Sequence, residues 1–198
     1  MCRFIETIRV EKGRPLHVEY HNQRMNDTRL AFWPEAKVLT LTDYLLPPGH
    51  SEVMKCRVIY SEGVEEVTYT PYTIRPVQSL CLVCSNTLDY AFKSANRDAI
   101  NQLYQQKGVK DDVLIVKNGL ITDTSIANVA FFDGANWFTP KNPILKGTQR
   151  AQLLQRGIIQ EKEITVEQLY SFSQISIFNA MIPFQTILID IHRDSISW

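Results

Sequence analysis

Lys93 is the side chain whose surroundings best suit covalent chemistry. It lies between the apolar run Tyr90, Ala91 and Phe92 and the start of a predicted helix. Apolar neighbours disfavour the ammonium form, which is how an amine becomes a nucleophile near neutral pH. A lysine beside a helix is, however, usually a solvated surface group. The local sequence leaves both interpretations open.

Arg24 and two histidines lie near the front of another predicted helix. Arg24 follows His21 by one turn and shares its face of the helix, where it could bind an anion or simply be solvated. His17 and His21 are four residues apart, a spacing that also occurs in metal sites. The segment lacks the HExxH order, and no third ligand lies at a fitting distance in the sequence. We therefore predict no metal site.

Backbone amides at two places could bind a phosphate. A helix is predicted to begin after Gly147, so the amides of Thr148 and Gln149 would have no acceptor within it. A second set of turn amides follows an apolar strand at Asn179 and Ala180. Most helix starts and loops bind nothing, so neither place is specific by itself.

Asp123 and the cysteines have simpler local interpretations. Asp123 lies in the segment ITDTSIAN between two predicted strands, where a turn carboxylate is the plain expectation. Cys81 and Cys84 form a CxxC within SLCLVCS, which is typical of a buried strand. Three residues along a strand place the two thiols on opposite faces, which argues against zinc. We predict that the four cysteines are reduced core residues.

The composition excludes several kinds of partner. The 198 residues are 44% hydrophobic, and 21 basic residues balance 21 acidic ones. Without net charge there is no positive field for nucleic acid or an anionic membrane, so a small molecule or a second copy of the chain is expected. The first ten residues are charged where a signal peptide is apolar, and no stretch reaches the roughly 18 apolar residues of a membrane span. We expect a cytoplasmic protein.

Strand and helix patterns alternate along the chain, which indicates a mixed fold. Residues 1–74 are predicted to form a small N-terminal domain of two hairpins and a helix. Its expected elements are strands at 3–10 and 15–17, a helix over 18–33 stopped by Pro34, and strands at 55–60 and 64–69. Residues 73–76 are the predicted linker.

Residues 75–198 are predicted to form a larger domain that is rich in strands. One strand begins at residue 80, and others are expected at 113–116, 120–121, 129–132, 137–139, 175–178 and 186–190. Asn118 and Gly119 together are a strong hairpin signal. Helices are predicted over 95–107, with Gly108 as a left-handed cap, over 148–156 and over 166–172.

The order of these features resembles the class IV aminotransferases, which are the fold type IV pyridoxal phosphate enzymes. Five segments carry the resemblance: FIETIRVEKGRPLHVEYHNQRM, FKSANRDAINQL, LIVKNGLITDTSIANVAFF, WFTPKNPILKGTQRAQLL and FNAMIPF. It implies an α+β fold of two domains, a small N-terminal α/β domain and a larger strand-rich domain that binds the cofactor. It also implies pyridoxal 5'-phosphate as cofactor and a homodimer.

The resemblance assigns roles to the candidate residues. Lys93 would hold the cofactor covalently, and Arg24 would bind its phosphate. The phosphate site would be completed by backbone amides, those of Thr148, Gln149, Asn179 and Ala180. The family's carboxylate, which keeps the pyridine nitrogen protonated, comes from an E-x-S-x-x-N run, here Asp123, Ser125 and Asn128.

Three features depart from the family pattern. Asp123 is one methylene shorter than the usual glutamate, and Thr148 stands where the family has an aliphatic residue. The chain is also expected to lack the strand and loop that normally precede the FIETIR strand in the family, so substrate contacts from that region would be absent or supplied by a partner subunit.

The lysine segment discriminates best among members of the family. FKSANR is similar to the K-x-x-N-R pattern of 4-amino-4-deoxychorismate lyases, and FNAMIPF is similar to one of their turns. We therefore predict a lyase of folate biosynthesis that makes 4-aminobenzoate and pyruvate, with Lys93 as both covalent anchor and general base. Arg97 is either a contact to a substrate carboxylate or a surface residue. The alternatives are an aminotransferase for a branched-chain or D-amino acid and a non-catalytic relative that binds the cofactor.

Overall fold

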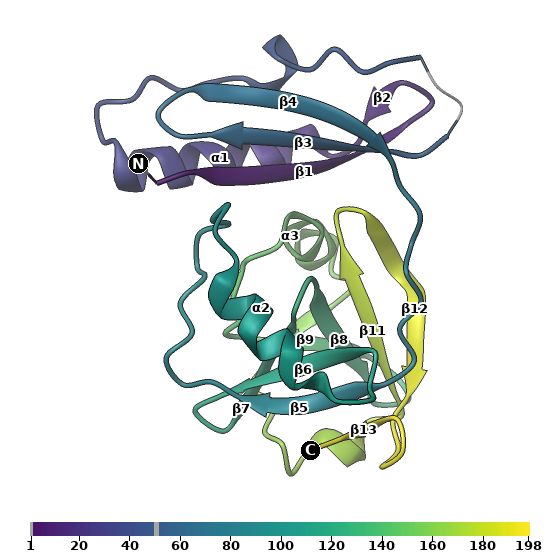
Figure 1. The fold of residues 1–198 in the computed structure, drawn as a ribbon. Coiled ribbons are helices and arrows are strands. Elements are labelled where there is room, and N and C mark those ends of the chain that lie inside the picture. Colours follow the sequence, from purple (N-terminus) through teal and green to yellow (C-terminus); the bar gives the residue numbers. More distant parts are fainter. Residues whose placement is uncertain (1, 50–51) are drawn as a thin grey trace. The chain divides into compact units, whose positions relative to one another are not determined.

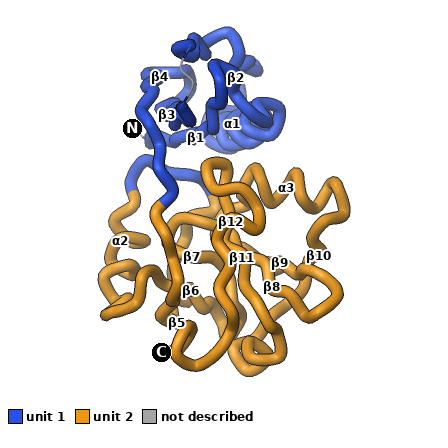
Figure 2. Tube along the Cα trace, turned by 90° about the vertical axis from the view of Figure 1, so that its right-hand side faces the viewer, with its two compact units in different colours: residues 1–74, 92–96 blue, residues 75–91, 97–198 orange. Residues whose placement is uncertain are grey.

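The chain folds into two compact units, one of residues 1–74 and 92–96, the other of residues 75–91 and 97–198 (Figure 2). The computed structural model describes residues 2–49 and 52–198. Helices and strands occur in both units, so the predicted α+β class is confirmed (Figure 1). The predicted domains, 1–74 and 75–198, differ from the units in residues 92–96, the segment that carries Lys93.

The first unit is a four-stranded antiparallel sheet with one helix along it. The strand order is β2-β1-β3-β4. The elements are β1 (Phe4–Glu11), β2 (Arg14–Pro15), α1 (Val18–Phe32), the 3-10 turn η1 (Leu41–Asp43), β3 (Met54–Tyr60) and β4 (Val64–Pro71). Alternate residues of β1 and β3 are buried and share one core with Met25 of α1, which fixes the helix against the sheet.

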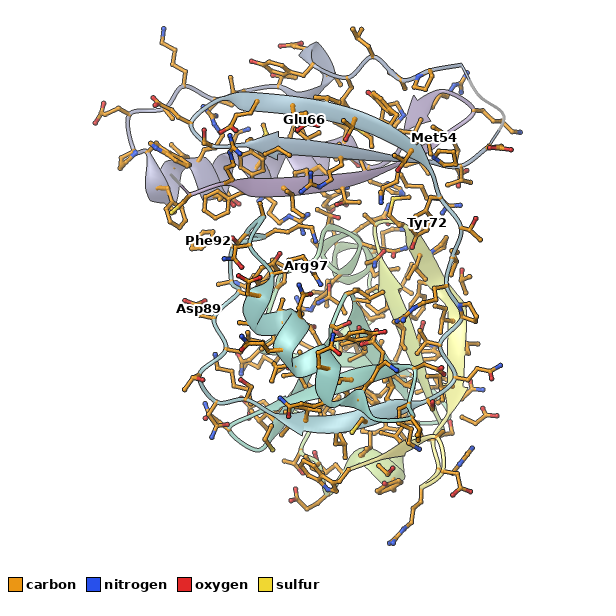
Figure 3. All side chains as sticks on the ribbon, in the orientation of Figure 1. Met54, Glu66, Tyr72, Asp89, Phe92 and Arg97 are labelled. Carbon is orange, nitrogen blue, oxygen red and sulfur yellow. The ribbon has the colours of Figure 1, made fainter. Side chains whose placement is uncertain are left out.

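Residues 92–96 lie along the N-terminal end of β1. The Ile5 N–H donates to the Lys93 carbonyl (2.9 Å), and the Ala95 N–H donates to the Arg3 carbonyl (2.8 Å). Phe92, labelled in Figure 3, also packs against aromatic rings of the first unit. Its ring centroid lies 6.3 Å from that of Phe4 on β1 and 5.0 Å from that of Phe32 on α1. The lysine segment is therefore tied to the first unit by both backbone and side-chain contacts.

The second unit contains two sheets. One has the order β13-β5-β6-β7, with β7 antiparallel to its neighbour, and the other has the order β10-β9-β8-β11-β12, with only β10 parallel to its neighbour. The strands are β5 (Leu80–Cys84), β6 (Asp112–Lys117), β7 (Leu120–Thr124), β8 (Asn128–Phe132), β9 (Trp137–Pro140), β10 (Gln160–Lys162), β11 (Gln174–Asn179), β12 (Ile182–Asp190) and β13 (Ile196–Ser197). The helical elements are α2 (Asp98–Tyr104), η2 (Gln105–Lys107), α3 (Thr148–Gln155) and η3 (Leu169–Ser171).

Several predicted elements need correction. The helix expected over 95–107 begins at Asp98, because residues 92–96 run beside β1 instead. The helix expected over 166–172 is a single 3-10 turn, which suffices to bury Leu169 and Phe172 three residues apart. Gly108 has a positive φ of 58° but a ψ of −126°, so it is not the predicted left-handed cap.

The cysteines also differ from the prediction of a core location. Cys56 is buried, but Cys2 and Cys84 are exposed and Cys81 is intermediate. All four are free thiols.

Within the described residues, no helix is both long and apolar enough to cross a membrane.

Phe4 is predicted to hold the lysine segment in place. It is 3% exposed, and its ring contacts four aromatic side chains of the first unit: Phe32, Trp33, Tyr60 and Phe92. Phe4→Ala should lower the free energy of unfolding by about 3 to 5 kcal/mol. It should also speed tryptic cleavage after Lys93, measured by mass spectrometry under native conditions.

Phe131→Ala is the matched control for this experiment. Phe131 is fully buried in the second unit, where its ring packs on Phe172. Its removal should destabilise the protein without selectively exposing the bond after Lys93. Equal cleavage at that bond in both variants would contradict the assigned role of Phe4.

Candidate functional site

Glu6 is the centre of a buried polar cluster in the first unit. It is fully buried on the face of β1 that also buries Phe4 and Ile8. One carboxylate oxygen lies 2.5 Å from Nδ1 of His21, and Arg24 donates to both oxygens, from Nε (2.9 Å) and Nη2 (2.5 Å). His21 and Arg24 are one turn apart on α1, so both side chains reach Glu6 from the same face of the helix.

The charges in this cluster are set by their neighbours. Burial alone would raise the pKa of Glu6, but the charge of Arg24 and the hydrogen bond from His21 outweigh it and lower that pKa to about 2. Burial lowers the pKa of His21, although Glu6 opposes the shift. Neutral imidazole is therefore the favoured form of His21 at pH 7, and its Nδ1–H donates to the Glu6 carboxylate.

Lys93 belongs to the same unit. Its backbone is hydrogen-bonded to β1, and its charge acts on His21. Its carbonyl accepts from Ile5, one residue before Glu6, and its side chain is half-buried. The charge of Lys93 is among the influences that lower the pKa of His21. Lys93 and Arg24, two of the predicted cofactor residues, thus belong to one unit.

Asp123 and Asn128 form a second polar cluster, in the other unit. Asp123 is 5% exposed near the end of β7, and Asn128 begins β8. Asn128 Nδ2 donates to Asp123 Oδ1 (2.8 Å) and to the Leu145 carbonyl (2.9 Å), while the Leu145 N–H donates to Asp123 Oδ2 (2.9 Å). Both carboxylate oxygens are held by neutral amide donors.

Burial raises the pKa of Asp123 from 3.8 to about 6. The hydrogen bonds from Leu145 and Asn128 and the charge of Arg150 oppose that shift without cancelling it. The carboxylate is therefore still ionised at pH 7, in a place where a nearby cation would stabilise it.

The start of α3 and the turn after β11 are hydrogen-bonded to each other. With the Gln149 amide in the orientation that satisfies both of its ends, its nitrogen donates to the carbonyls of Asn179 (2.5 Å) and Ile182 (2.8 Å), and its oxygen accepts from the Phe184 N–H (3.2 Å). The Asn179 side chain caps its own turn, because its Oδ1 accepts from Met181 and Ile182.

Asn179 also links this turn to the loop after Asp123, since its Nδ2 donates to the Ile126 carbonyl (3.1 Å). The predicted phosphate residues of this unit, Thr148, Gln149, Asn179 and Ala180, therefore lie on two connected segments.

Arg97 contacts two other residues of the second unit. Its Nη2 donates to the Ser125 carbonyl (2.8 Å), and its guanidinium lies 5.9 Å from the centre of the Tyr90 ring. Arg97 thus supports the loop that follows Asp123. Its contact with a substrate carboxylate stays a prediction.

The two histidines considered as metal ligands have different surroundings. His17 is exposed in a left-handed conformation, whereas His21 is 1% exposed and bonded to Glu6. The described ranges, 2–49 and 52–198, hold no group of three or more potential metal ligands.

Comparisons with known proteins identify the family of the chain. The model for the family "Amino-transferase class IV" matches residues 3–188. A Haemophilus influenzae protein named only as uncharacterized is 34% identical over 185 residues, which is 91% of this chain and 98% of that protein. The chain belongs to the class IV aminotransferase family.

Two solved structures of similar proteins cover nearly the whole chain. A protein of Haemophilus somnus named "putative 4-amino-4-deoxychorismate lyase" has a TM-score of 0.87 and 31% identity, covering 92% of this chain and 97% of its own. A "putative amino-acid aminotransferase" of Mesorhizobium loti has a TM-score of 0.78 and 22% identity, with coverage of 97% and 100%. The second likeness supports the fold alone.

The residues of this member of the class IV aminotransferase family can be compared with what pyridoxal phosphate needs. The cofactor needs an amine, donors for a phosphate and a carboxylate for its ring nitrogen. Lys93 supplies the amine, and the Arg24 guanidinium, which donates to both oxygens of Glu6, supplies the type of donor that a phosphate needs. The Asp123 carboxylate is buried and oriented by Asn128 and Leu145. The donor set fits the cofactor.

Three contributors were missed in the sequence. Glu6 was read only as a charge that interrupts an apolar run, although its place between Phe4 and Ile8 in an alternating strand puts it on the buried face. Leu145 donates its backbone N–H to Asp123, and a backbone contact cannot be predicted from the pattern of side chains. Gly147 was assigned only to a helix start.

Glu6→Gln should destabilise the first unit. Removing one partner of a buried ion pair costs about 3 to 5 kcal/mol at pH 7. Because folding lowers the pKa of Glu6, its stabilising effect is complete above about pH 4.5 and is lost as the pH falls towards 2. Urea unfolding should therefore show a lower free energy of unfolding for Glu6→Gln than for the unsubstituted protein at pH 7. This difference should become smaller as the pH falls below about 4.5.

Glu66→Gln is the matched control, because Glu66 is an exposed residue of β4 (labelled in Figure 3). It should leave the unfolding free energy within about 0.5 kcal/mol of the native value. Equal stability of the two variants would show that Glu6 does not hold the cluster together.

Asp123→Asn should change the pH dependence of the apoprotein. Because folding raises the pKa of Asp123 from 3.8 to about 6, its ionisation reduces stability as the pH rises through this range, by roughly 3 kcal/mol in all. Asparagine cannot ionise, so urea unfolding between pH 4 and 8 should lack this decline. Asp27→Asn, at an exposed position of α1, is the control that should retain it. An identical pH profile for Asp123→Asn and the native protein would contradict the raised pKa.

Proposed function

We propose that this class IV aminotransferase homologue binds pyridoxal 5'-phosphate and acts as a lyase that converts 4-amino-4-deoxychorismate to 4-aminobenzoate and pyruvate. The observation that carries the proposal is the likeness, over 92% of this chain and at 31% identity, to the Haemophilus somnus protein with that name. The lysine segment FKSANR, which is similar to that of such lyases, supports the same reaction.

The two polar clusters would contact different parts of the cofactor. Lys93 would hold it covalently, and Arg24, oriented by Glu6, would bind its phosphate together with amides at Thr148, Gln149, Asn179 and Ala180. Asp123, held by Asn128, would keep the ring nitrogen protonated. When bound, the cofactor supplies an electron sink for the carbon that carries the substrate amine.

Lys93 Nζ would move the proton in the reaction. It takes the proton from the substrate carbon that carries the amine, while the bond from the ring to the enolpyruvyl oxygen breaks. The ring becomes aromatic, which drives the elimination, and protonation of the released enolpyruvate gives pyruvate. The predicted homodimer and cytoplasmic location stay predictions.

The products distinguish the candidate functions. Purified protein with bound cofactor should release equal amounts of 4-aminobenzoate and pyruvate from 4-amino-4-deoxychorismate, measured by chromatography. Lys93→Ala should lower that rate by at least about a thousandfold, and borohydride reduction should fix the cofactor on Lys93 of the native protein. Lys37→Ala, at an exposed lysine outside both clusters, should leave the rate unchanged.

Other outcomes would overturn the proposal in different ways. Turnover only with a branched-chain or D-amino acid and a keto acid would replace the lyase by an aminotransferase. Cofactor bound at Lys93 without either reaction would indicate a non-catalytic relative. A protein that takes up no cofactor would contradict all three.

A further inference from the structure

Gly147 lies against the side chain of Asn128. A Cβ atom built on Gly147 would be 2.0 Å from Oδ1 of Asn128 and 3.2 Å from its Cγ. The backbone of Gly147 has φ −68° and ψ 147°, an extended conformation that any residue adopts. Glycine is therefore required here for space and not for backbone freedom.

The carboxamide that fills this space is fixed on its other side. Asn128 is 6% exposed, and its Nδ2 donates to both Asp123 Oδ1 and the Leu145 carbonyl. The Leu145 N–H donates to Asp123 Oδ2, so three hydrogen bonds join Asp123, Asn128 and Leu145 in a closed ring. Asp123, Asn128 and Leu145 can therefore move only together.

A methyl group at position 147 would break this ring. To restore even a tight contact, the Asn128 oxygen must move from 2.0 Å to 3.0 Å or more from the new carbon, a shift of at least about 1 Å. Because the carboxamide is rigid and planar, moving its oxygen by this amount also displaces Nδ2 and disturbs its bonds to Asp123 (2.8 Å) and to the Leu145 carbonyl (2.9 Å). The Asp123 carboxylate would then lose the donor that orients one of its two oxygens.

We propose that Gly147 is a positioning residue for Asp123: its missing side chain admits the Asn128 carboxamide, which aims the carboxylate at the ring nitrogen of the cofactor. This inference rests on the proposed cofactor binding and adds to it a specific role for the residue before α3. Gly147 acts through Asn128 and need not touch the cofactor.

The test compares two ligands that differ only at the ring nitrogen. Pyridoxal phosphate and its 1-deaza analogue, in which a carbon replaces that nitrogen, are titrated into apoprotein and followed by absorbance. The native protein should prefer pyridoxal phosphate, and Gly147→Ala should reduce that preference by about ten- to a hundredfold, the loss expected for a hydrogen bond to a charged group. General damage to the fold would weaken both ligands equally.

Gly63→Ala is the control for the substitution itself. A Cβ at Gly63 meets nothing within 4 Å, and its φ lies outside the positive region. The variant should keep the native preference between the two ligands.

Removing the carboxamide should abolish the effect of the methyl group. Asn128→Ala alone should lose the preference, and Gly147→Ala added to it should cause no further loss, because nothing remains to clash. If Gly147→Ala does not fold, the double variant should nevertheless fold with the stability of Asn128→Ala.

Each remaining outcome contradicts the inference. Gly147→Ala with the native preference, or additive losses in the double variant, would remove the role of Gly147 while leaving cofactor binding intact. Native protein that binds both ligands equally would show that Asp123 does not reach the ring nitrogen. Native protein that binds neither would overturn the proposed function itself.

Discussion

The hydrogen bonds from Asn128 and Leu145 to the buried Asp123 carboxylate determine how the candidate site of the second unit is built. They join the end of β7, the start of β8 and the segment that leads into α3. A buried carboxylate without such donors would be strongly destabilising, so these three segments must meet where they do. The position of the α3 amides follows from the same contacts, because Gly147 is packed against Asn128.

Glu6 and Asp123, two of the buried carboxylates in the described part of the chain, have different kinds of partner. Both side chains are buried, yet the pKa of Glu6 is lowered to about 2 and that of Asp123 is raised to about 6. Glu6 receives two hydrogen bonds from the guanidinium of Arg24, whereas the direct donors of Asp123 are neutral amides. The negative charge of Glu6 is therefore balanced within its own unit. That of Asp123 is oriented but lacks a contacting cation among these partners, which suits a carboxylate that pairs with a ligand.

Local patterns predicted most of the fold and part of the site. Alternation in β1 and β3 and the Asn118-Gly119 turn are local signals, so these elements were found. Residues 92–96 were not, because their pairing with β1 joins positions about 90 apart and overrides the local tendency of residues 95–97 to extend the helix. The ordered set of Lys93, Arg24 and Asp123 could be recognised as a family pattern. The roles of Leu145 and Gly147 could not, since they act through a backbone amide and through an absent side chain.

The raised pKa of Asp123 bears on the proposal that an aspartate acts here in place of the glutamate that is usual in the family. An aspartate is shorter, but both of its oxygens are fixed here, so less conformational freedom is lost when it meets a ligand. Its ionisation above pH 6 costs the apoprotein about 3 kcal/mol, because the pKa lies about two units above 3.8. A protonated ring nitrogen beside the carboxylate would remove that cost. A cation beside this fixed carboxylate would therefore favour its ionised form.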